Sequence, residues 1–136
     1  MGKLTTFNNR QVTYVETMRV KDGVECDTYS FVSDGSEDLA IVRVTKGFKT
    51  PLQRILKGTK TIEGYIRGSG TLTVTSKDRS IKIYSFSQEA DANPNPEIEV
   101  HIGELMQWSA KTDLTFYEIC EPPYEDGRFE NLTEKS

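Results

Sequence analysis

The chain has 136 residues, of which 28% are charged and 35% hydrophobic, and its formal net charge is −4 at pH 7. This length predicts one domain, because domains mostly contain about 100–200 residues. Such a chain buries roughly two-thirds of its unfolded surface, enough for a core without metal or disulfide support. It contains no basic run, which argues against a nucleic acid as the main partner. No stretch approaches the roughly 20 apolar residues that cross a bilayer, so we expect no membrane partner.

The cysteines and the N-terminus bear on the cellular compartment. Residues 1–16 contain no apolar core and no small-residue cleavage site, so no secretory signal is expected there. Cys26 and Cys120 are the two cysteines. One disulfide between them is the alternative to reduced thiols, and the missing signal favours reduced thiols in a cytoplasmic protein.

Strand patterns dominate the chain from its N-terminus onward. Residues 11–20 and 26–33 alternate apolar and polar side chains and are rich in β-branched and aromatic residues. Residues 38–47 have apolar side chains of both parities, which predicts a strand covered on both faces. Further short strand segments follow at 50–58, 61–70, 71–78, 80–87, 98–110 and 114–123.

Turn residues separate these segments at 57–58, 68–70 and 77–78. Residues 89–97 include two prolines and no apolar run, and we expect a surface loop there. No amphipathic helix of three turns is indicated, so the fold class is all-β, a sandwich or a barrel. A jelly roll is the closure we favour, because it leaves few free strand edges.

The segment 47–74 has the spacing of a motif that reads Gly, five residues, His-x-His, three or four residues, Glu, six residues and Gly. Counted from Gly47, the histidine slots hold Gln53 and Ile55, and counted back from Gly68, the glutamate slot holds Thr61. The gap between the two halves is one residue longer than the usual pattern. In this spacing, and in YIRGSGTLTV around the glycine turn, the chain resembles a small single-domain cupin of the RmlC-like type.

The resemblance extends over about residues 38–124 and implies a double-stranded β-helix, or jelly-roll barrel, that forms a homodimer. We therefore expect one cupin-like domain over 1–136, with N-terminal strands at 11–33, the core at about 38–124 and a C-terminal tail at 125–136. The second cupin motif is matched only at Gly103. Its later slots hold Ser109, Lys111, Leu114 and Glu118, and none of these matches.

Cupin metal centres usually combine three histidines and one glutamate, a ligand set that suits transition metals. His101 is the only histidine in this chain, so that set cannot be assembled. We therefore expect a cupin without a bound metal or other cofactor, with His101 as a strand residue near the barrel rim.

Side chains of one strand that share parity point the same way, so residues in step with the empty ligand slots should face the barrel interior. This predicts a ligand site made of Gln53, Lys57, Thr61, Glu63 and Tyr65. The plainer interpretation places Lys57 and Glu63 at strand ends in solvent and Tyr65 in the core. Arg54 and Arg67 have the opposite parity and should face outward.

Trp108 is a further candidate, because an indole ring at a cavity mouth stacks on sugars, although a lone tryptophan in an all-β chain more often lies in a core or an interface. The candidate catalytic residues are Glu63 as a base with Tyr65 or Lys57 as an acid. Cys120 has no basic neighbour in sequence that would activate its thiol, and we expect it to be buried and unreactive.

Three functions remain open from the sequence. The first is a metal-free cupin that binds a small polar molecule, a sugar or an organic acid, without turnover. The second is a metal-independent isomerase or lyase acting on a carbohydrate derivative. The third is a dimeric interaction protein whose barrel is packed.

Overall fold

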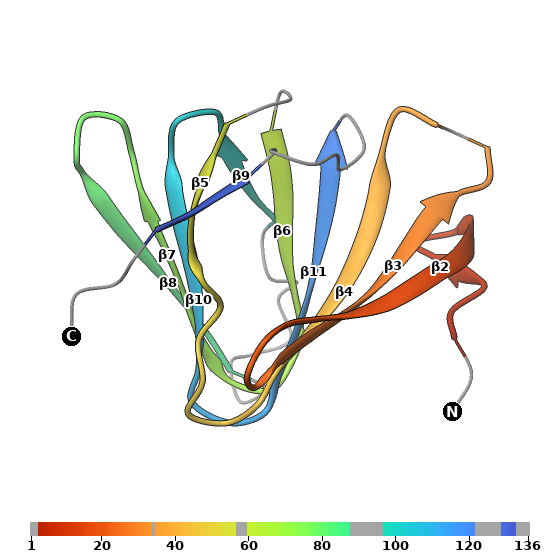
Figure 1. The fold of residues 1–136 in the computed structure, drawn as a ribbon, viewed down its shortest axis with the longest axis horizontal. Coiled ribbons are helices and arrows are strands. Elements are labelled where there is room, and N and C mark those ends of the chain that lie inside the picture. The colour runs from red at the N-terminus through yellow and green to blue at the C-terminus, as the bar shows by residue number, and fades with distance from the viewer. Residues whose placement is uncertain (1–2, 34, 57–59, 88–96, 122–128, 133–136) are drawn as a thin grey trace.

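The computed structural model describes residues 3–33, 35–56, 60–87, 97–121 and 129–132. These residues form two antiparallel sheets, and no helix occurs among them. The sheets face each other in a V (Figure 1). They meet at a closed end, which contains the turn between β6 and β7, and they spread apart at an open end, where β9 turns into β10 (Figure 1).

The seven-stranded sheet has the order β1-β2-β3-β4-β11-β6-β9. Its strands are β1 (Thr6–Phe7), β2 (Arg10–Lys21), β3 (Val24–Phe31), β4 (Asp38–Val44), β6 (Lys60–Arg67), β9 (Ile98–His101) and β11 (Leu114–Glu121).

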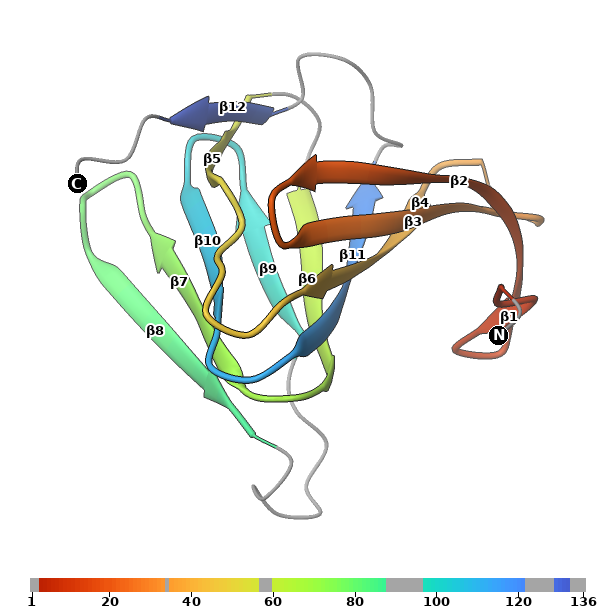
Figure 2. The ribbon, with the colours of Figure 1, turned by 60° about the horizontal axis from the view of Figure 1, so that its bottom comes forward.

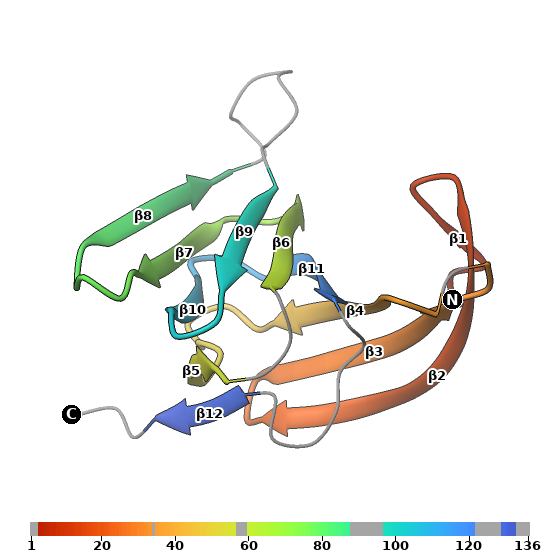
Figure 3. The same cartoon turned by 90° about the horizontal axis from the view of Figure 1, so that it is seen from above.

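The five-stranded sheet has the order β12-β5-β10-β7-β8. Its strands are β5 (Leu52–Ile55), β7 (Gly70–Thr75), β8 (Ile81–Phe86), β10 (Leu105–Ala110) and β12 (Phe129–Leu132). Strand β12 lies beside β5, and β8 forms the opposite edge of the sheet (Figure 2). Seen from above, the β2–β3 hairpin extends along the other side of the molecule (Figure 3).

Strand pairing determines which side chains point between the sheets, because residues opposite each other in register share a face. In the pairing of β6 with β11, Thr61 lies opposite Cys120, Glu63 opposite Glu118 and Tyr65 opposite Phe116. These three pairs run in that order from the open end toward the closed end and all face the barrel interior.

Aromatic rings fill the interior toward the closed end. Tyr65 stacks on Phe86 at 5.3 Å between ring centroids, Phe86 on Trp108 at 5.4 Å, and Trp108 on Phe116 at 4.2 Å. Aliphatic side chains surround this stack and complete the main core. Stacked aromatic pairs add about 0.5–1.5 kcal/mol each beyond the burial of their area. The closed half of the barrel is therefore packed by side chains.

A second apolar cluster covers the outer face of the seven-stranded sheet. It is built from Val12, Tyr29, Phe31, Leu39 and Ile119, which are all buried. The N-terminal strands lie over this face, where the ring of Phe7 meets Tyr117 edge to face at 4.9 Å. This explains why strand 38–44 has apolar side chains on both faces, as the sequence predicted.

Gly68 makes the tight turn between β6 and β7 possible. Its φ is +94°, and a Cβ at this position would lie 2.0 Å from the carbonyl oxygen of Asp113. Only glycine adopts this conformation readily and leaves room for that backbone contact. The glycine turn of the sequence motif is thus a close approach between two neighbouring turns.

The predicted all-β class is confirmed, and the expected strands are present with shifts of a few residues at their ends. Two strands were missed: β1, and β12 within the region that was interpreted as a tail. The predicted turn at 57–58 and most of the predicted loop at 89–97 lie outside the described residues. The described part of the chain contains no helix that is long and apolar enough to cross a membrane.

Candidate functional site

Glu63 is the central residue of the candidate site. It lies in β6, faces the barrel interior and has 0% of its surface exposed. Its Oε1 accepts a hydrogen bond of 2.8 Å from the indole Nε1 of Trp108. Its Oε2 is also buried and finds no hydrogen-bond donor among the described residues. A buried carboxyl oxygen without a donor costs free energy, so the groups beside Oε2 determine how this atom is satisfied.

Glu118 lies beside Glu63. It is half-buried and directly opposite Glu63 in the register of β6 and β11. Burial is the largest cause that raises the pKa of Glu63 well above its usual value, and the charge of Glu118 and a hydrogen bond with it raise this pKa further. The hydrogen bond from Trp108 and the nearby hydroxyl of Thr61 lower the pKa of Glu63 and so act in the opposite direction. Burial and the neighbouring Glu118 therefore favour the protonated form of the Glu63 carboxyl group.

Thr61 and Gln53 are both on the interior face, as their parity predicted. Thr61 is fully buried, and its hydroxyl lies 4.0 Å from the sulfur of Met106. Gln53 is half-buried, lies opposite Met106 in register and donates from Nε2 to Oδ1 of Asn131 at 3.0 Å. The polar interior positions toward the open end thus come from β5, β6, β11 and β12.

Tyr65 also faces inward, but its hydroxyl is directed elsewhere. It donates to the carbonyl oxygen of Gly68 at 2.6 Å, at the closed end, and its ring stacks on Phe86. Burial raises the pKa of its hydroxyl. Tyr65 therefore supports the glycine turn, and its hydroxyl is not paired with the Glu63 carboxyl group.

The proposed stacking role of Trp108 is corrected by the structure. Its side chain is only 2% exposed, and its ring lies between Phe86 and Phe116. Because both ring faces are covered, no sugar can stack on it. Trp108 contributes to the site through its indole N–H, which fixes the orientation of the Glu63 carboxyl group.

The remaining candidates lie outside this arrangement. Lys57 is outside the described residues. Arg54 lies on the outer face of β5 and forms an ion pair of 3.0 Å with Glu130, as its parity predicted. Arg67 is exposed at the end of β6.

The residues in the ligand slots do not fit the metal centre that the fold family implies. The slots hold an amide at Gln53, an apolar side chain at Ile55 and a hydroxyl at Thr61, all on the interior face. His101 is 54% exposed on the outer face of β9, where its ring nitrogens lie 3.5 Å from Glu99 and from Glu104. Within the described part of the chain, no three His, Cys, Asp or Glu side chains gather closely enough to hold a metal ion.

Both cysteines are buried as free thiols, as expected. The pKa of Cys26 is raised to about 11, first by burial and then by the charge of Glu118. The sulfur of Cys120 lies 3.9 Å from Oε1 of Glu118. Cys26 is therefore a neutral thiol at physiological pH, and Cys120 forms part of the wall beside Glu118.

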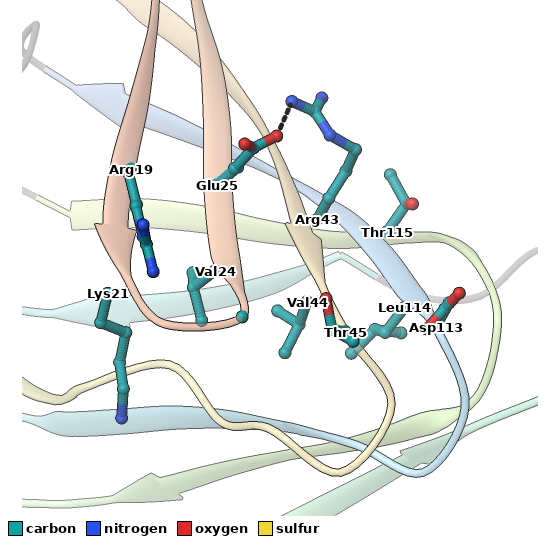
Figure 4. A pocket seen from close by; sticks show the side chains of 11 residues that line it. Arg19, Lys21, Val24, Glu25, Arg43, Val44, Thr45, Asp113, Leu114 and Thr115 are labelled. Atoms are coloured by element: carbon teal, nitrogen blue, oxygen red, sulfur yellow. Dashed lines mark hydrogen bonds and ion pairs between the residues drawn. The ribbon is translucent and has the colours of Figure 1, made fainter.

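Two surface hollows lie at the closed end, away from Glu63 and Glu118. One has a volume of about 550 Å³ and is lined mainly by serine and threonine side chains at the ends of β7, β8 and β10. The other, of about 460 Å³, lies between the β2–β3 hairpin and the ends of β4 and β11 (Figure 4). In it, Arg43 is bound by Glu25 at 3.0 Å, and Arg19 is paired with Asp22. These ion pairs balance the charge of both arginines, and Lys21 also lines the hollow.

Glu118 is the site residue that sequence reasoning missed. It occupies the last slot of the second cupin motif, which was counted as a mismatch. That slot nevertheless faces the interior, and Glu118 shares parity with Phe116 and Cys120. The interior-facing position of Glu118 in the motif, rather than its residue type, could have identified it as a site residue.

Comparisons with known proteins support the fold. No family model matches the chain, and no curated protein matches it. Among solved structures, a Shewanella oneidensis protein is 13% identical with a TM-score of 0.60, and the match covers 75% of this chain and 65% of that one. Salicylate 1,2-dioxygenase from Pseudoaminobacter salicylatoxidans, in complex with gentisate, is 11% identical with a TM-score of 0.58, over 75% of this chain and 26% of that one.

A third match has almost the same length as this chain. The Streptomyces protein PAC13, solved with uridine, is 15% identical with a TM-score of 0.64, and the match covers 96% of this chain and 95% of that one. The chain thus spans less than two-thirds of the first two proteins and nearly all of the third. At these identities the likeness shows the fold alone, which is the cupin jelly roll that the resemblance implied.

Proposed function

We propose that this cupin-fold chain binds a small polar molecule at the open end of its barrel, without turnover. The observation that carries the proposal is Oε2 of Glu63, a fully buried acceptor without a donor among the described residues. In the free protein a proton shared with Glu118 is one way to satisfy this atom, and a ligand hydroxyl or amino group is another. The half-buried side chains of Gln53 and Glu118 lie on the same interior surface and supply further hydrogen-bonding groups.

The charge of the site favours one of the two expected ligand classes. Two carboxyl groups face each other across β6 and β11. An organic acid would bring a further negative charge close to them, whereas a sugar brings hydroxyl donors. A sugar-like molecule is therefore preferred to an organic acid. The uridine in the PAC13 structure is a hydroxylated molecule of this kind, in a protein of the same fold and length.

An acid–base enzyme is the second candidate, and the carboxyl pair favours it. Burial and Glu118 raise the pKa of Glu63, and a carboxyl group with a raised pKa beside a second carboxyl group is typical of acid–base sites. In this arrangement Glu63 would serve as the acid, with Glu118 as the base, whereas the sequence suggested Glu63 as the base. Turnover of a carbohydrate derivative that is lost in Glu118→Gln would favour the enzyme over the binding protein.

A packed-barrel interaction protein is the third candidate, supported by the aromatic stack that fills the closed half. If this candidate is right, replacing Glu63 or Gln53 changes stability and nothing else.

A thermal-shift screen separates the three candidates. The purified protein is tested against neutral sugars, nucleosides, sugar nucleotides, organic acids and divalent metals, with and without a chelator. A ligand that binds only the folded state stabilises it by about 2.7 kcal/mol at a concentration of a hundred times its Kd. We expect a stabilising hit among the hydroxylated molecules that chelator leaves unchanged and Glu118→Gln abolishes.

Glu99→Gln is the matched control, because Glu99 is exposed on the outer face of β9 and the change removes the same charge. A hit that survives Glu118→Gln would place the ligand elsewhere. A flat screen would contradict the binding proposal and favour the packed barrel.

A further inference from the structure

In the free protein, a proton shared by Glu63 and Glu118 would satisfy the interior carboxyl pair that these two residues form. Ionised carboxylates only accept hydrogen bonds. Oε1 of Glu63 is occupied by Trp108, and Oε2 has no donor in the described residues, so a proton between the two carboxyl groups is what satisfies this atom. Residues directly opposite each other in an antiparallel pair have Cβ atoms about 5 Å apart, close enough for the two groups to meet.

The titratable groups that face Glu63 are mostly carboxyl groups and thiols. Strand register places them on β11, β4, β3 and β6 itself, and the nearest charge that acts on Glu63 is that of Glu118. The titratable interior groups toward Glu63 are Glu118 and Cys120 on β11, Asp38 on β4, Cys26 on β3 and Tyr65 on β6. On β10 the facing polar group is the indole of Trp108, and on β5 it is the amide of Gln53.

We propose that the ligand of this barrel carries a protonated amine, and that its ammonium group takes the place of the proton shared by Glu63 and Glu118. The inference rests on the binding function proposed above and specifies the ligand's charge. The exchange is balanced: the ammonium keeps its protons, Glu63 ionises, and one proton leaves to solvent. Binding therefore releases about one proton and tightens as pH rises.

The two carboxyl groups of Glu63 and Glu118 favour a cationic ligand over a neutral or an anionic one. Burial opposes a second negative charge beside Glu118, and an ammonium brings the opposite charge that allows both carboxyl groups to ionise. A neutral hydroxyl leaves the shared proton in place. An anion adds to the repulsion and is the class most strongly excluded.

The test uses two matched sets of probes that differ in charge on a common skeleton. One set is glucosamine, glucose and glucuronate, and the other is ethanolamine, ethylene glycol and glycolate. Titration calorimetry in two buffers of different ionisation enthalpy measures both affinity and the number of protons released. We expect the amine of at least one set to bind most tightly, to release about one proton at pH 7, and to gain up to about tenfold in affinity per pH unit.

Variants connect the proton to the pair. Glu63→Gln removes the carboxyl group that loses the proton, so proton release should fall to zero in this variant. In Glu118→Gln burial still favours a proton on Glu63, and the loss of the second carboxyl group should instead weaken binding of the amine relative to the neutral probe of the same set. Binding of the amine to Glu99→Gln should release about one proton, as it does in the parent protein. If Glu63→Gln does not fold, judged by its circular dichroism and melting temperature, the weaker binding of the amine by Glu118→Gln, a change at a more exposed position, carries the test.

Each other outcome overturns the inference in a distinct way. If a neutral probe binds as tightly as the amine and releases no proton, the amine inference fails and the proposed function stands. If no probe of either set binds, both fail and the packed barrel is favoured. If Mg²⁺ or Ca²⁺ binds with proton release, chelator reverses it and the amines have no effect, the exchanging cation is a metal and the amine inference is wrong.

Discussion

Glu63 shows how surroundings set the charge of a single side chain. A carboxylate buried in an apolar barrel is strongly disfavoured, so burial and the neighbouring carboxyl group of Glu118 raise the pKa of Glu63 and favour its protonated form. Trp108 holds one oxygen in place, which leaves the other facing Glu118. The orientation of the Glu63 carboxyl group therefore depends on Trp108, whose ring stacks on Phe86 and Phe116.

Replacing Glu63 by two residues of different polarity tests this arrangement. In Glu63→Gln the amide oxygen still accepts from Trp108 and the amide nitrogen donates to Glu118, so we expect the free energy of unfolding at pH 7 to change by less than about 1 kcal/mol. In Glu63→Leu the indole N–H of Trp108 is left buried without an acceptor, and the expected loss is about 1–3 kcal/mol. Urea unfolding of both variants measures the difference, and equal losses would contradict the role of the hydrogen bond.

The pH dependence of stability follows from the same residue. Because the pKa of Glu63 is raised in the folded state, folding binds a proton, and the stabilisation is fully present below the usual value of 4.5. It is lost as pH rises from there toward the folded-state pKa, by up to about 1.4 kcal/mol per pH unit. The free energy of unfolding of the parent should thus fall relative to Glu63→Gln between pH 5 and 7. Parallel curves for the two proteins would show that Glu63 is ionised when folded.

At the scale of elements, the closed end is organised by the turn between β6 and β7. Gly68 has a φ of +94° and lies against the backbone at Asp113, and the hydroxyl of Tyr65 is bonded to the carbonyl of the same glycine. This turn sets the position of β6, which carries Thr61 and Glu63 toward the open end. At that end, β12 completes the five-stranded sheet by pairing with β5, where Asn131 reaches Gln53.

A glycine replacement tests the turn. Gly68→Ala puts a Cβ against the Asp113 carbonyl at a positive φ, and we expect a loss of at least about 2 kcal/mol in the free energy of unfolding. Gly35→Ala is the matched control, because nothing lies within 4 Å of the Cβ it would add, and it should change stability by less than about 0.5 kcal/mol. Thermal or urea unfolding compares them, and equal effects would show that the turn tolerates a side chain.

For the whole molecule, the outer face of β8, β7 and β10 is notable for its lack of charge. Strand register places nine side chains on it, and all are uncharged: Ile81, Ile83, Ser85, Thr71, Thr73, Thr75, Leu105, Gln107 and Ser109. Ile81 and Ile83 are 62% and 64% exposed. In a chain with 28% charged residues, an uncharged and partly apolar sheet face is suited to an interface.

The homodimer expected from the cupin resemblance gives a prediction for this face. We expect the protein to elute as a dimer in light-scattering chromatography, and Ile83→Lys to shift it toward a monomer, because two copies would bring the new charges together. Val32→Lys, at an apolar residue that is 59% exposed outside this face, should leave the dimer intact. A dimer that survives Ile83→Lys would place the interface elsewhere.

Properties that depend on neighbours along the chain were predictable from the sequence alone. Alternation within single strands indicated an all-β fold, and parity within β6 correctly placed Thr61, Glu63 and Tyr65 on one face. The glycine turn at Gly68 was also readable, because its backbone requirement is local. These features follow from the two-residue period of a strand and from the conformational freedom of glycine.

Which distant strands lie side by side became known only from the assembled barrel. The partner of Glu63 is Glu118, the cover of Trp108 is Phe86 and Phe116, and the neighbour of β5 is β12. Register between distant strands depends on how the whole barrel closes, so no local pattern specifies it. The charge of Glu63 depends on that register, because burial and a neighbouring carboxyl group exist only once the sheets have assembled.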